Sequence, residues 1–420
     1  WCTSGCAWAG ETAEPESEME KPSAAELEQF RREVAAWLES ERPEPPDFLL
    51  PETFLEVGTD EQLEYLRAWQ RKVYEAGYLG MAWPREYGGG GRPAVFQEIV
   101  NQEMQRLRVP FVPNTIGLNW AGPLILQMAS EEDKRRYIPG ILSCDDIWCQ
   151  GFSEPDHGSD LGSVQTRAVR DGDSYRIRGS KIWTTLGGHA KYMILLARTD
   201  PDGASKYAGL SFFLAPMQVP GITTRPIRKL TGEYGFYETF FDDARIAADC
   251  RLGEEGQGWQ IAMATLAFER GAAGGQAGGL SSQAGGVGDV VELARRARRD
   301  GRPALEDPIV RDELVKFLIE ERADALCRER AAIPALVSER PAAIALSGKL
   351  RTSEHRRRLM RFAQSLLGAQ AARWVGDPGV VDGGLWQRSY LNTFSSTIGG
   401  GTSQVLANVV GERVLGLPKQ

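Results

Sequence analysis

Apolar residues recur every three or four positions in the first third of the chain, and this period predicts amphipathic helices. A proline-rich connector follows the first of them, because proline lacks the amide donor that a helix needs. In the first helix, residues 24–41, the apolar positions on one face are Leu27, Phe30, Val34 and Leu38. The other predicted helices are residues 59–76, residues 94–107 and a segment that begins at Ser130.

Between residues 147 and 252 apolar and polar positions alternate, and this period of two predicts strands separated by glycine- and proline-containing turns. No helical segment in this range is long enough to connect parallel strands. We therefore expect a small antiparallel β-barrel that holds one side of a flat ligand. The predicted strands are residues 174–178, 192–197, 210–215 and 238–241, and a further strand is expected to begin at Trp148.

Helical spacing returns for the rest of the chain, and four long helices predict an antiparallel bundle. The predicted fold class is therefore α+β, with three domains after a leader of residues 1–22 that we expect to be disordered or to reflect an early start of translation. The predicted domains are residues 23–146, 147–252 and 253–420. The predicted bundle helices are residues 258–270, 308–323, 355–368 and 402–415.

The charge balance argues against polyanionic partners. The chain has 420 residues, of which 25% are charged, and a net charge of −8, whereas nucleic acids and anionic membranes require a basic face. Two local runs, Arg295 to Arg299 and Arg356 to Arg358, are exceptions. They are interpreted either as solvated helix faces or as contacts for ligand phosphates.

Metal and hydrolytic chemistry find no support in the sequence. The six cysteines lack zinc-site spacing, and the three histidines form no paired ligand pattern, so neither a metal site nor a Ser-His-Asp hydrolase is expected. A reducing cytoplasm is the simplest location for these cysteines. No apolar run of about 18 residues occurs, and the first residues lack the basic flank and the length of a signal peptide.

Residues 148–185 concentrate groups suited to a planar ligand. They begin W-C-Q-G-F-S-E-P-D-H-G-S-D and end G-S-K-I-W-T-T, which predicts a strand, a proline turn, a loop and a second strand. Gly158 lets the backbone approach a ligand closely, and Trp183 offers a flat apolar face. We expect a planar cofactor with polar edges. The hydroxyl donors are Ser153, Ser159, Thr184 and Thr185.

This segment resembles the flavin-binding middle domain of the acyl-CoA dehydrogenases, in which S-E-P-x-x-G-S-D is followed by G-x-K-x-W. Because motifs in the same order cover most of the chain, the chain is identified as a member of that family. The resemblance implies the family's fold, FAD as the cofactor and an acyl-CoA substrate. Further matching motifs are M-A-W-P-R-E-Y-G-G from Met81, F-F-D-D-A-R-I near Phe240, E-E-G-Q-G-W from Glu254 and I-G-G-G-T-S-Q from Ile398.

The resemblance also implies the reaction and its contacts. A base removes the proton α to the thioester and flavin N5 takes the β-hydrogen as hydride, which gives a trans-2-enoyl-CoA. An electron-transfer flavoprotein then accepts the electrons from the reduced flavin. Ser159 matches a position that contacts the CoA chain. The flavin contacts implied are Gln150, Phe152, Ser153, Trp183 and Thr185, with Thr402 and Gln404 approaching from the C-terminal loop.

The position of the base follows from a comparison within the family. Many relatives carry it in a Y-E-G-T loop, but this chain has Gly400 at that place. Isovaleryl-type members carry it on the first bundle helix directly before an arginine, which corresponds to Glu269 and Arg270 here. The resemblance therefore implies Glu269 as base, Arg270 as its orienting partner and the Gly400 N–H as a donor to the thioester oxygen. An exposed Glu269 in an ordinary ion pair is the alternative.

Two motifs that contact the flavin of a neighbouring subunit in this family are only partly present in this chain. R-x-x-F-G is replaced by R-R-A-R-R-D-G-R-P from Arg295, and Q-x-x-G-G-x-G is reduced to Gln364 and Gly368. The departures favour weaker flavin retention or an unlike partner subunit, so either a homotetramer or an α2β2 assembly, as in steroid side-chain members, is expected. A flavin-sharing or structural subunit, and a same-fold flavin monooxygenase, remain alternatives.

A glycine-rich stretch, Gly271 to Gly288, falls where the family continues its first bundle helix. Each glycine inside a helix costs about 1 kcal/mol relative to alanine. Two interpretations stay open. The stretch permits close packing at a subunit contact, or it makes room beside the acyl pocket for a bulky or fused-ring acyl group.

Overall fold

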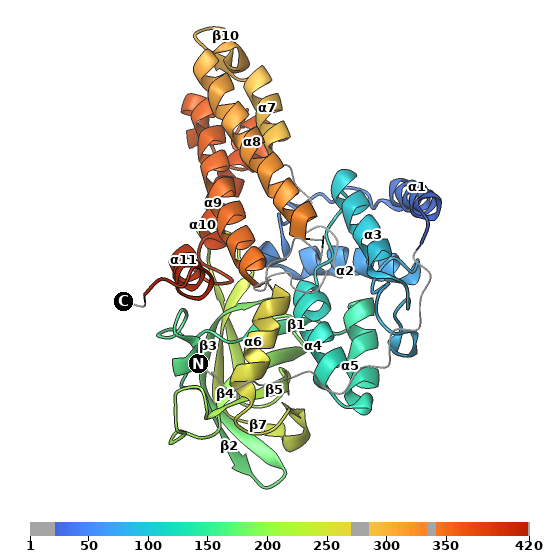
Figure 1. The fold of residues 1–420 in the computed structure, drawn as a ribbon, viewed down its shortest axis with the longest axis vertical. Helices are drawn as coiled ribbons and strands as arrows, with labels where there is room; N and C mark the ends of the chain where they lie inside the picture. The colour runs from blue at the N-terminus through green and yellow to red at the C-terminus, as the bar shows by residue number, and fades with distance from the viewer. Residues whose placement is uncertain (1–21, 270–284, 332, 334–341, 419–420) are drawn as a thin grey trace.

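The computed structural model describes residues 22–269, 285–331, 333 and 342–418. Figure 1 shows helices from the first third of the chain beside a sheet, and a tower of C-terminal helices rising above both. The predicted leader lies outside the described residues except for Pro22, and so does most of the glycine-rich stretch.

Four of the N-terminal helices, α1, α2, α3 and α5, form where the sequence predicted them, whereas α4 and the π-helical turn before it were not predicted. Short polar side chains cap three of them, since the hydroxyls of Ser23, Thr59 and Ser130 each accept a hydrogen bond from a backbone N–H of the first turn. The apolar face of the first helix is buried through Phe30, Val34 and Leu38. The helices are α1 (Ala24–Glu41), α2 (Asp60–Glu75), α3 (Ala94–Arg106), α4 (Gly122–Met128) and α5 (Glu131–Ser143), with a π-helical turn at Gly117–Ala121.

The middle domain is a sheet of eight strands in the order β6-β7-β3-β2-β4-β5-β8, with β1 beside β4. Adjacent strands are mostly antiparallel, as expected, but β4 pairs in parallel with β1 and also with β2, through Arg167 and Arg198. The β1–β4 pair needs no crossover helix, because the β2–β3 hairpin lies between these two strands in sequence and returns the chain. The strands are β1 (Trp148–Gly151), β2 (Arg167–Asp171), β3 (Ser174–Thr185), β4 (Tyr192–Arg198), β5 (Leu210–Pro216), β6 (Ile222–Ile227), β7 (Phe236–Ala247) and β8 (Arg251–Leu252).

The C-terminal third is helical apart from a small hairpin of β9 (Arg298–Arg299) and β10 (Arg302–Pro303). Its helices α7 to α10 share a core of their own that contains Val290, Leu314, Met360 and Trp386. The helices are α6 (Gly258–Glu269), α7 (Val287–Arg296), α8 (Pro308–Ala331), α9 (Ala342–Leu367), α10 (Leu385–Ser396) and α11 (Ser403–Val409).

The helix α6 does not join that bundle core, although the sequence placed it first among the bundle helices. It lies against β4 and β5, and its Ile261 and Ala262 belong to the larger core shared with the sheet and the N-terminal helices (Figure 1). The physical reason is that α6 is apolar on most sides, so it is covered on several sides instead of presenting one stripe to a bundle. The unpredicted helices α7 and α10 complete the bundle instead.

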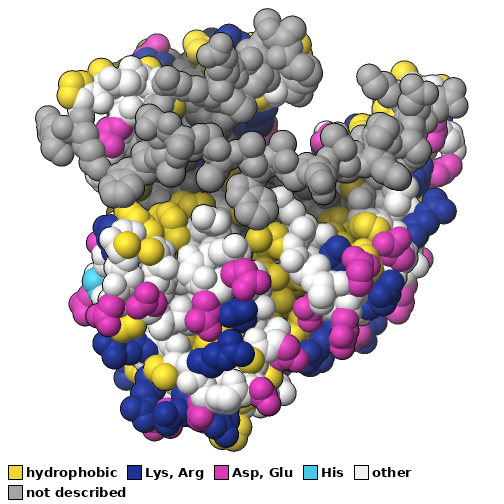
Figure 2. All heavy atoms as spheres, turned by 60° about the horizontal axis from the view of Figure 1, so that its bottom comes forward, with side chains coloured by type: hydrophobic (Ala, Val, Ile, Leu, Met, Phe, Trp, Pro, Cys, Tyr) yellow, Lys and Arg dark blue, Asp and Glu magenta, His cyan; other side chains and the backbone are white. Residues whose placement is uncertain are grey.

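The surface agrees with the mixed charge of the sequence. On the face shown in Figure 2, Lys and Arg side chains alternate with Asp and Glu side chains, and hydrophobic side chains gather near the centre of the view. Across the ranges that the structure describes, none of the helices combines the length and apolarity required to span a bilayer. Within the same ranges, no group of three His, Cys, Asp or Glu side chains is arranged to hold a metal ion.

Candidate active site

The end of strand β3 carries a β-bulge that turns Trp183 outward. The β3–β7 register shifts between Lys181 and Thr184, and Trp183 adopts a φ of 62°, a left-handed conformation that few residues other than glycine adopt. The indole is 54% exposed and meets the Phe236 ring edge-on at 5.9 Å. A large aromatic ring is therefore held at the surface by a strained backbone, which is a common feature of binding sites.

A buried ion pair fixes the S-E-P turn next to this bulge. Lys181 Nζ lies 2.8 Å from Glu154 Oε1, with the two side chains 0% and 7% exposed, and it also donates to the Phe152 carbonyl at 3.0 Å. Glu154 accepts further hydrogen bonds from the backbone N–H groups of Gln165 and Thr166. The pair thus connects the turn, the loop after it and strand β3 at one point.

Burial lowers the pKa of Lys181 to about 8, although the neighbouring carboxylate opposes the shift. Burial alone would raise the pKa of Glu154. The Lys181 charge and the hydrogen bonds from Lys181 and Thr166 outweigh burial, so the pKa of Glu154 lies below its usual value. Both groups are therefore ionised near neutral pH. A desolvated pair with all its hydrogen bonds made is rigid, which suits a scaffold for the bulge.

The two threonines after Trp183 have different roles. The Thr184 hydroxyl is buried and bonded to the Tyr237 carbonyl and to the Thr239 hydroxyl, so it belongs to the sheet and cannot serve as the ligand donor that the sequence suggested. Thr185 is paired with Phe236 in the ladder, and its side chain makes no hydrogen bond within the described part of the chain. Thr185 is therefore the hydroxyl available to a ligand.

On the other side of the turn, Gln150 has an unpaired amide. Its Nε2 is buried and has no hydrogen-bond partner among the described residues, and a buried polar group in that state normally indicates a missing partner. Ser153 lies close to the bulge, because its carbonyl accepts a hydrogen bond from the Ile182 N–H at 2.9 Å. Phe152 packs on Phe212 in the core, and its role toward a ligand is limited to a small exposed edge.

Ser159 lies apart from this group, on the exposed loop after Gly158. No side chain or backbone atom approaches the position of a Cβ at Gly158, so the loop backbone is open to a ligand there. The neighbouring Asp160 is committed to Lys206 and Ser163. Ser159 remains a predicted contact for the CoA chain.

The C-terminal loop is positioned by the bundle. Lys349 Nζ on α9 donates to the carbonyls of Ser396 and Gly401 at 2.9 and 2.8 Å, and the Thr402 hydroxyl caps α11. Gly400 has a φ of 66°, which a residue with a Cβ adopts only with strain. Gln404 is exposed on α11. The expected roles of Gly400, Thr402 and Gln404 stay predictions.

The proposed base lies at the end of the described segment. Glu269 is the last residue of α6, but its side chain is not among those described, and Arg270 lies outside the described residues. Gln364 on α9 has a buried Nε2 without a hydrogen-bond partner in the described ranges, and Gly368 follows the helix with a φ of 54°. The predicted contact of Gln364 with a neighbour's flavin would supply such a partner.

Sequence reasoning assigned no role to Lys181 and Glu154, although both lie inside the quoted motifs. The available signal was a lysine at an alternating position that otherwise faces the core, opposite a carboxylate in a turn. A second buried pair, Arg388 with Glu233, carries no such signal because its members are far apart in the sequence.

Helices, a sheet and helices in this order, with an exposed aromatic bulge on the sheet, define the three-domain acyl-CoA dehydrogenase fold. Family profiles match the whole arrangement: the acyl-CoA dehydrogenase N-terminal domain over residues 24–145, the middle domain over 149–244 and the C-terminal domain over 256–415. The chain belongs to the acyl-CoA dehydrogenase family, whose members are FAD-binding flavoproteins.

Individual relatives agree. Acyl-CoA dehydrogenase IpdE1 of Mycobacterium tuberculosis is 37% identical over 403 residues, which cover 94% of this chain and 99% of IpdE1. The structure of the Tcur3481-Tcur3483 steroid ACAD is similar with a TM-score of 0.77 and 31% identity, covering 95% of this chain and 99% of that chain. The ChsE4-ChsE5 complex from Mycobacterium tuberculosis is similar with a TM-score of 0.76 and 28% identity, covering 96% and 100%.

The residues present fit FAD. A flat ring system with polar edge atoms matches the exposed Trp183 ring and the Thr185 hydroxyl on β3 and the unpaired Gln150 amide on β1, a strand that contacts β3. Ser153 adds its backbone at the same edge. These residues would hold the flavin ring on the sheet side.

Proposed function

We propose that the chain catalyses the FAD-dependent α,β-dehydrogenation of an acyl-CoA thioester to a trans-2-enoyl-CoA. The observation that supports this proposal most strongly is the Trp183 bulge. A strained backbone and an adjacent buried ion pair hold the Trp183 ring at the surface, where it adds nothing to the core and is available to a ligand. Gln150, Ser153 and Thr185 lie around it as further flavin contacts. The reduced flavin then passes its electrons to an electron-transfer flavoprotein.

The protein's part in the reaction is proton removal and charge stabilisation. Glu269 takes the α-proton, Arg270 orients that carboxylate, and the Gly400 N–H donates to the thioester oxygen as negative charge develops there. The glycine at 400 leaves space for a base that approaches from α6. When bound, FAD supplies the acceptor for the β-hydrogen as hydride. Thr402 and Gln404 contact the flavin from the bundle side, and Ser159 contacts the CoA chain.

The acyl group is proposed to be bulky, of the steroid-derived class. The support is the likeness to a structure named as a steroid ACAD, together with the glycine-rich stretch that removes side chains after Glu269. Straight-chain and branched acyl groups are the alternatives. A same-fold flavin monooxygenase is a third reading, and the Glu269-Arg270 pair disfavours it because that chemistry does not need this base.

The oligomer is proposed to be a homotetramer or an α2β2 heterotetramer with a related subunit. One face of α8 supports this, because Val315, Leu318 and Ile319 are 51%, 43% and 63% exposed at spacings of three and four residues. Gln364 and Gly368 would contact the flavin of the neighbour. Replacement of Ile319 by Asp should shift the mass measured by light scattering to smaller species, and an unchanged mass would remove α8 from the interface.

The location is proposed to be the cytoplasm. Cys144, Cys149 and Cys250 are buried free thiols, and burial raises the pKa of each, so they are unreactive. Fractionation of the native host would test this directly.

The experiment that tests the proposed reaction is product analysis with an artificial electron acceptor. The protein is incubated with straight-chain, branched and steroid-derived acyl-CoAs, and the masses of the thioesters are measured. The expected result is loss of two hydrogens from one class. From an α,α-dideuterated thioester the protein should remove one of the two deuterons, and the Glu269→Gln variant should leave both in place. Oxygen uptake without desaturation would favour the monooxygenase, and no turnover unless a related subunit is added would favour a structural subunit.

A further inference from the structure

The turn between β6 and β7, residues 228–235, is connected to the Trp183 bulge by a hydrogen bond and a ring contact. The Leu186 N–H donates to the Gly235 carbonyl at 3.0 Å, and the Phe236 ring, which follows the turn, makes the edge-on contact with Trp183. Lys229 Nζ lies 5.7 Å from the centroid of that same Phe236 ring. A displacement of the turn would therefore reach the exposed indole through direct contacts.

The turn is fixed from two sides by buried charges. Arg388 on α10 is 2% exposed, and its Nε donates to both carboxylate oxygens of Glu233 at 3.1 Å. On the other side Lys229 forms an ion pair with Glu56, whose side chain is also 2% exposed. Buried pairs of this kind are costly to break, because the remaining charge has no partner.

Arg388 also connects the turn to the N-terminal domain. Its Nη1 donates to the Leu50 carbonyl at 2.8 Å, while the next residue, Ser389, and Asn392 donate to Glu52. Burial raises the pKa of Glu52, with the two hydrogen bonds opposing the shift. One turn of α10 thus holds segments from all three domains.

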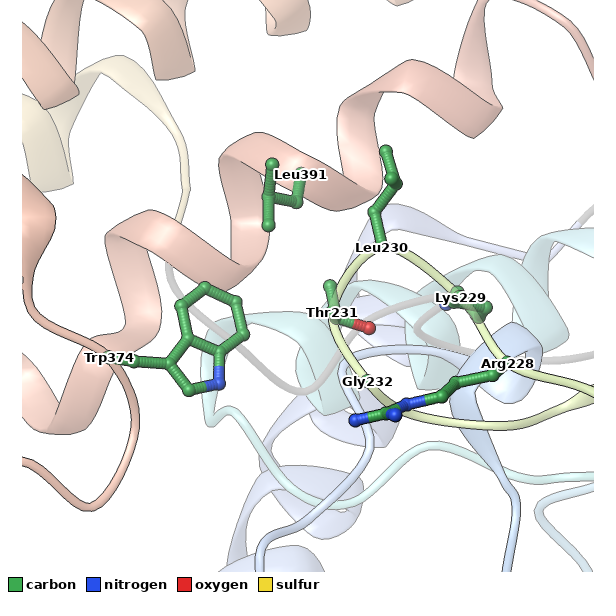
Figure 3. Close-up of a pocket in the computed structure, with 7 residues that line it drawn as sticks. All are labelled: Arg228, Lys229, Leu230, Thr231, Gly232, Trp374 and Leu391. Atoms are coloured by element: carbon green, nitrogen blue, oxygen red, sulfur yellow. The ribbon is translucent and has the colours of Figure 1, made fainter.

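Apolar packing between the turn and the bundle is incomplete. Figure 3 shows Leu230, Thr231 and Gly232 facing Trp374 and Leu391 across a surface pocket that is open to solvent, with a volume of about 290 Å³. Leu230 is 73% exposed, and the buried Thr231 hydroxyl has no partner among the described residues. The ion pairs of Glu233 with Arg388 and of Lys229 with Glu56 therefore hold the turn more firmly than apolar contact with the bundle does.

We propose that Arg388 is a positioning residue for the flavin site: through Glu233 it holds the 228–235 turn so that Phe236 keeps the Trp183 ring in place. The same helix continues into the loop of Gly400, so one residue relates the sheet side of the site to the bundle side. This inference rests on the proposed assignment of Trp183 to the flavin.

The test is a double-mutant cycle on FAD affinity, with Glu233→Gln and Trp183→Ala made singly and together in the full chain. Each single change is expected to weaken FAD binding, measured by quenching of flavin fluorescence, roughly tenfold. In the Trp183→Ala background, Glu233→Gln should add little, because the ring it positions is gone. Equal effects of Glu233→Gln in both backgrounds would overturn the proposal.

The matched control is Glu238→Gln. Glu238 is 14% exposed against 16% for Glu233, so the two carboxylates are matched in burial. Its partner Arg225 is exposed and belongs to the same hairpin, so the change breaks an ion pair of this hairpin without touching α10. It should leave FAD affinity within about twofold of the parent. A loss equal to that of Glu233→Gln would assign the effect to the hairpin in general and overturn the role of Arg388.

Two further variants keep the outcomes separate. Glu233→Asp retains the charge and should recover part of the affinity, whereas Arg388→Lys loses the bidentate geometry and should reproduce the loss. If Trp183→Ala leaves FAD affinity unchanged, the flavin assignment itself fails. If Trp183→Ala weakens binding and Glu233→Gln does not, only the positioning role fails.

Discussion

The bulge at Trp183 and the turn at Gly400 both depart from regular structure, but they are held in different ways. Trp183 is fixed by side chains, since the Lys181–Glu154 pair and the Phe236 ring surround a strained residue that carries a large ring. Gly400 lies in a turn that is fixed through its backbone, since the carbonyls of Ser396 and Gly401 accept hydrogen bonds from Lys349. The first arrangement presents an aromatic ring, whereas the second has no side chain at position 400.

From this difference we infer that the two sides of the site, the sheet side around Trp183 and the helical side around Gly400, have separate roles. The sheet side is rigid and suits a cofactor that stays bound, whereas the helical side carries the groups that are proposed to act on the substrate. Changes on the sheet side should therefore alter flavin affinity and stability, and changes on the helical side should alter turnover.

The largest expected effect is on the helical side. Replacement of Glu269 by Gln removes the base without changing its size, so the rate of flavin reduction by acyl-CoA should fall by about 10³- to 10⁴-fold while the protein stays yellow. Stopped-flow absorbance measures this rate. The control is Glu254→Gln, an exposed carboxylate just before α6, which should react at the parental rate. Near-normal reduction in the Glu269 variant would remove it as base.

On the sheet side, replacement of Lys181 by Met should be the most costly change. It leaves Glu154 buried without its counter-charge, and the free energy of unfolding should fall by about 3–5 kcal/mol. Urea denaturation measures the loss. The exposed pair Lys206–Asp160 provides the control, since Lys206→Met should cost less than about 1 kcal/mol. Equal losses for both variants would mean that burial of the Lys181 pair has no special weight.

Replacement of Trp183 by Gly should separate stability from binding. Glycine adopts a φ of 62° without strain, so relief of strain offsets the lost contact with Phe236 and the unfolding free energy should change by less than about 1 kcal/mol. FAD affinity should nevertheless fall roughly tenfold, because the stacking surface is lost. Titration calorimetry with FAD and a parallel thermal melt measure both quantities. A strongly destabilised variant with normal affinity would reverse the interpretation of the bulge.

At the Gly400 turn, replacement by Ala should cost about 1–2 kcal/mol of stability, because the φ of 66° is unfavourable for a residue with a Cβ. The added methyl group should also lower turnover more than it lowers FAD affinity, since the N–H is proposed to face the thioester. Steady-state kinetics beside an FAD titration compares the two. A variant that loses flavin and keeps its turnover per bound flavin would contradict the division between the two sides.

The smallest expected effect concerns acid stability of the bundle. Arg358 and His355 on α9 hold the pKa of Glu320 on α8 at about 2, below its ordinary value of 4.5. A depressed carboxyl pKa gives stability that is present above pH 4.5 and is lost as the pH falls toward 2. The urea midpoint should therefore drop over this range, and Glu320→Gln should make the drop shallower. Identical profiles for both proteins would exclude this pair as a contributor.

The sequence predicted the elements whose pattern is local. The helices α1, α2 and α5 follow apolar periodicity and hydroxyl caps, and α3 follows apolar periodicity alone. The family motifs predicted the flavin segment around Trp183, and that assignment stays a prediction. The sequence did not predict β2 and β6, because R-A-V-R-D and I-T-T-R-P-I have exposed polar faces and little apolar alternation. Their strand conformation depends on ladders with distant partners, which no local pattern records.

The helix α10 was missed for a related reason. Its sequence L-W-Q-R-S-Y-L-N-T-F-S-S contains many polar residues, yet it buries Arg388 and Ser389 against carboxylates of the other two domains, and Gln387 against the Gln370 carbonyl of its own domain. The Thr184 hydroxyl shows the converse, since its motif position suggested a ligand donor and the structure commits it to the sheet. Polar residues that serve tertiary contacts cannot be distinguished from solvent-facing ones by sequence alone.

The central claim is that this chain binds FAD at the Trp183 bulge and uses it to oxidise an acyl-CoA. The most direct measurement is the visible spectrum of the protein purified alone, followed by anaerobic titration with straight-chain, branched and steroid-derived acyl-CoAs. The account predicts a yellow protein whose flavin absorbance bleaches with one class of thioester, and a Glu269→Gln variant that stays yellow. A colourless preparation that does not take up added FAD, or a flavin that no acyl-CoA bleaches, would contradict it.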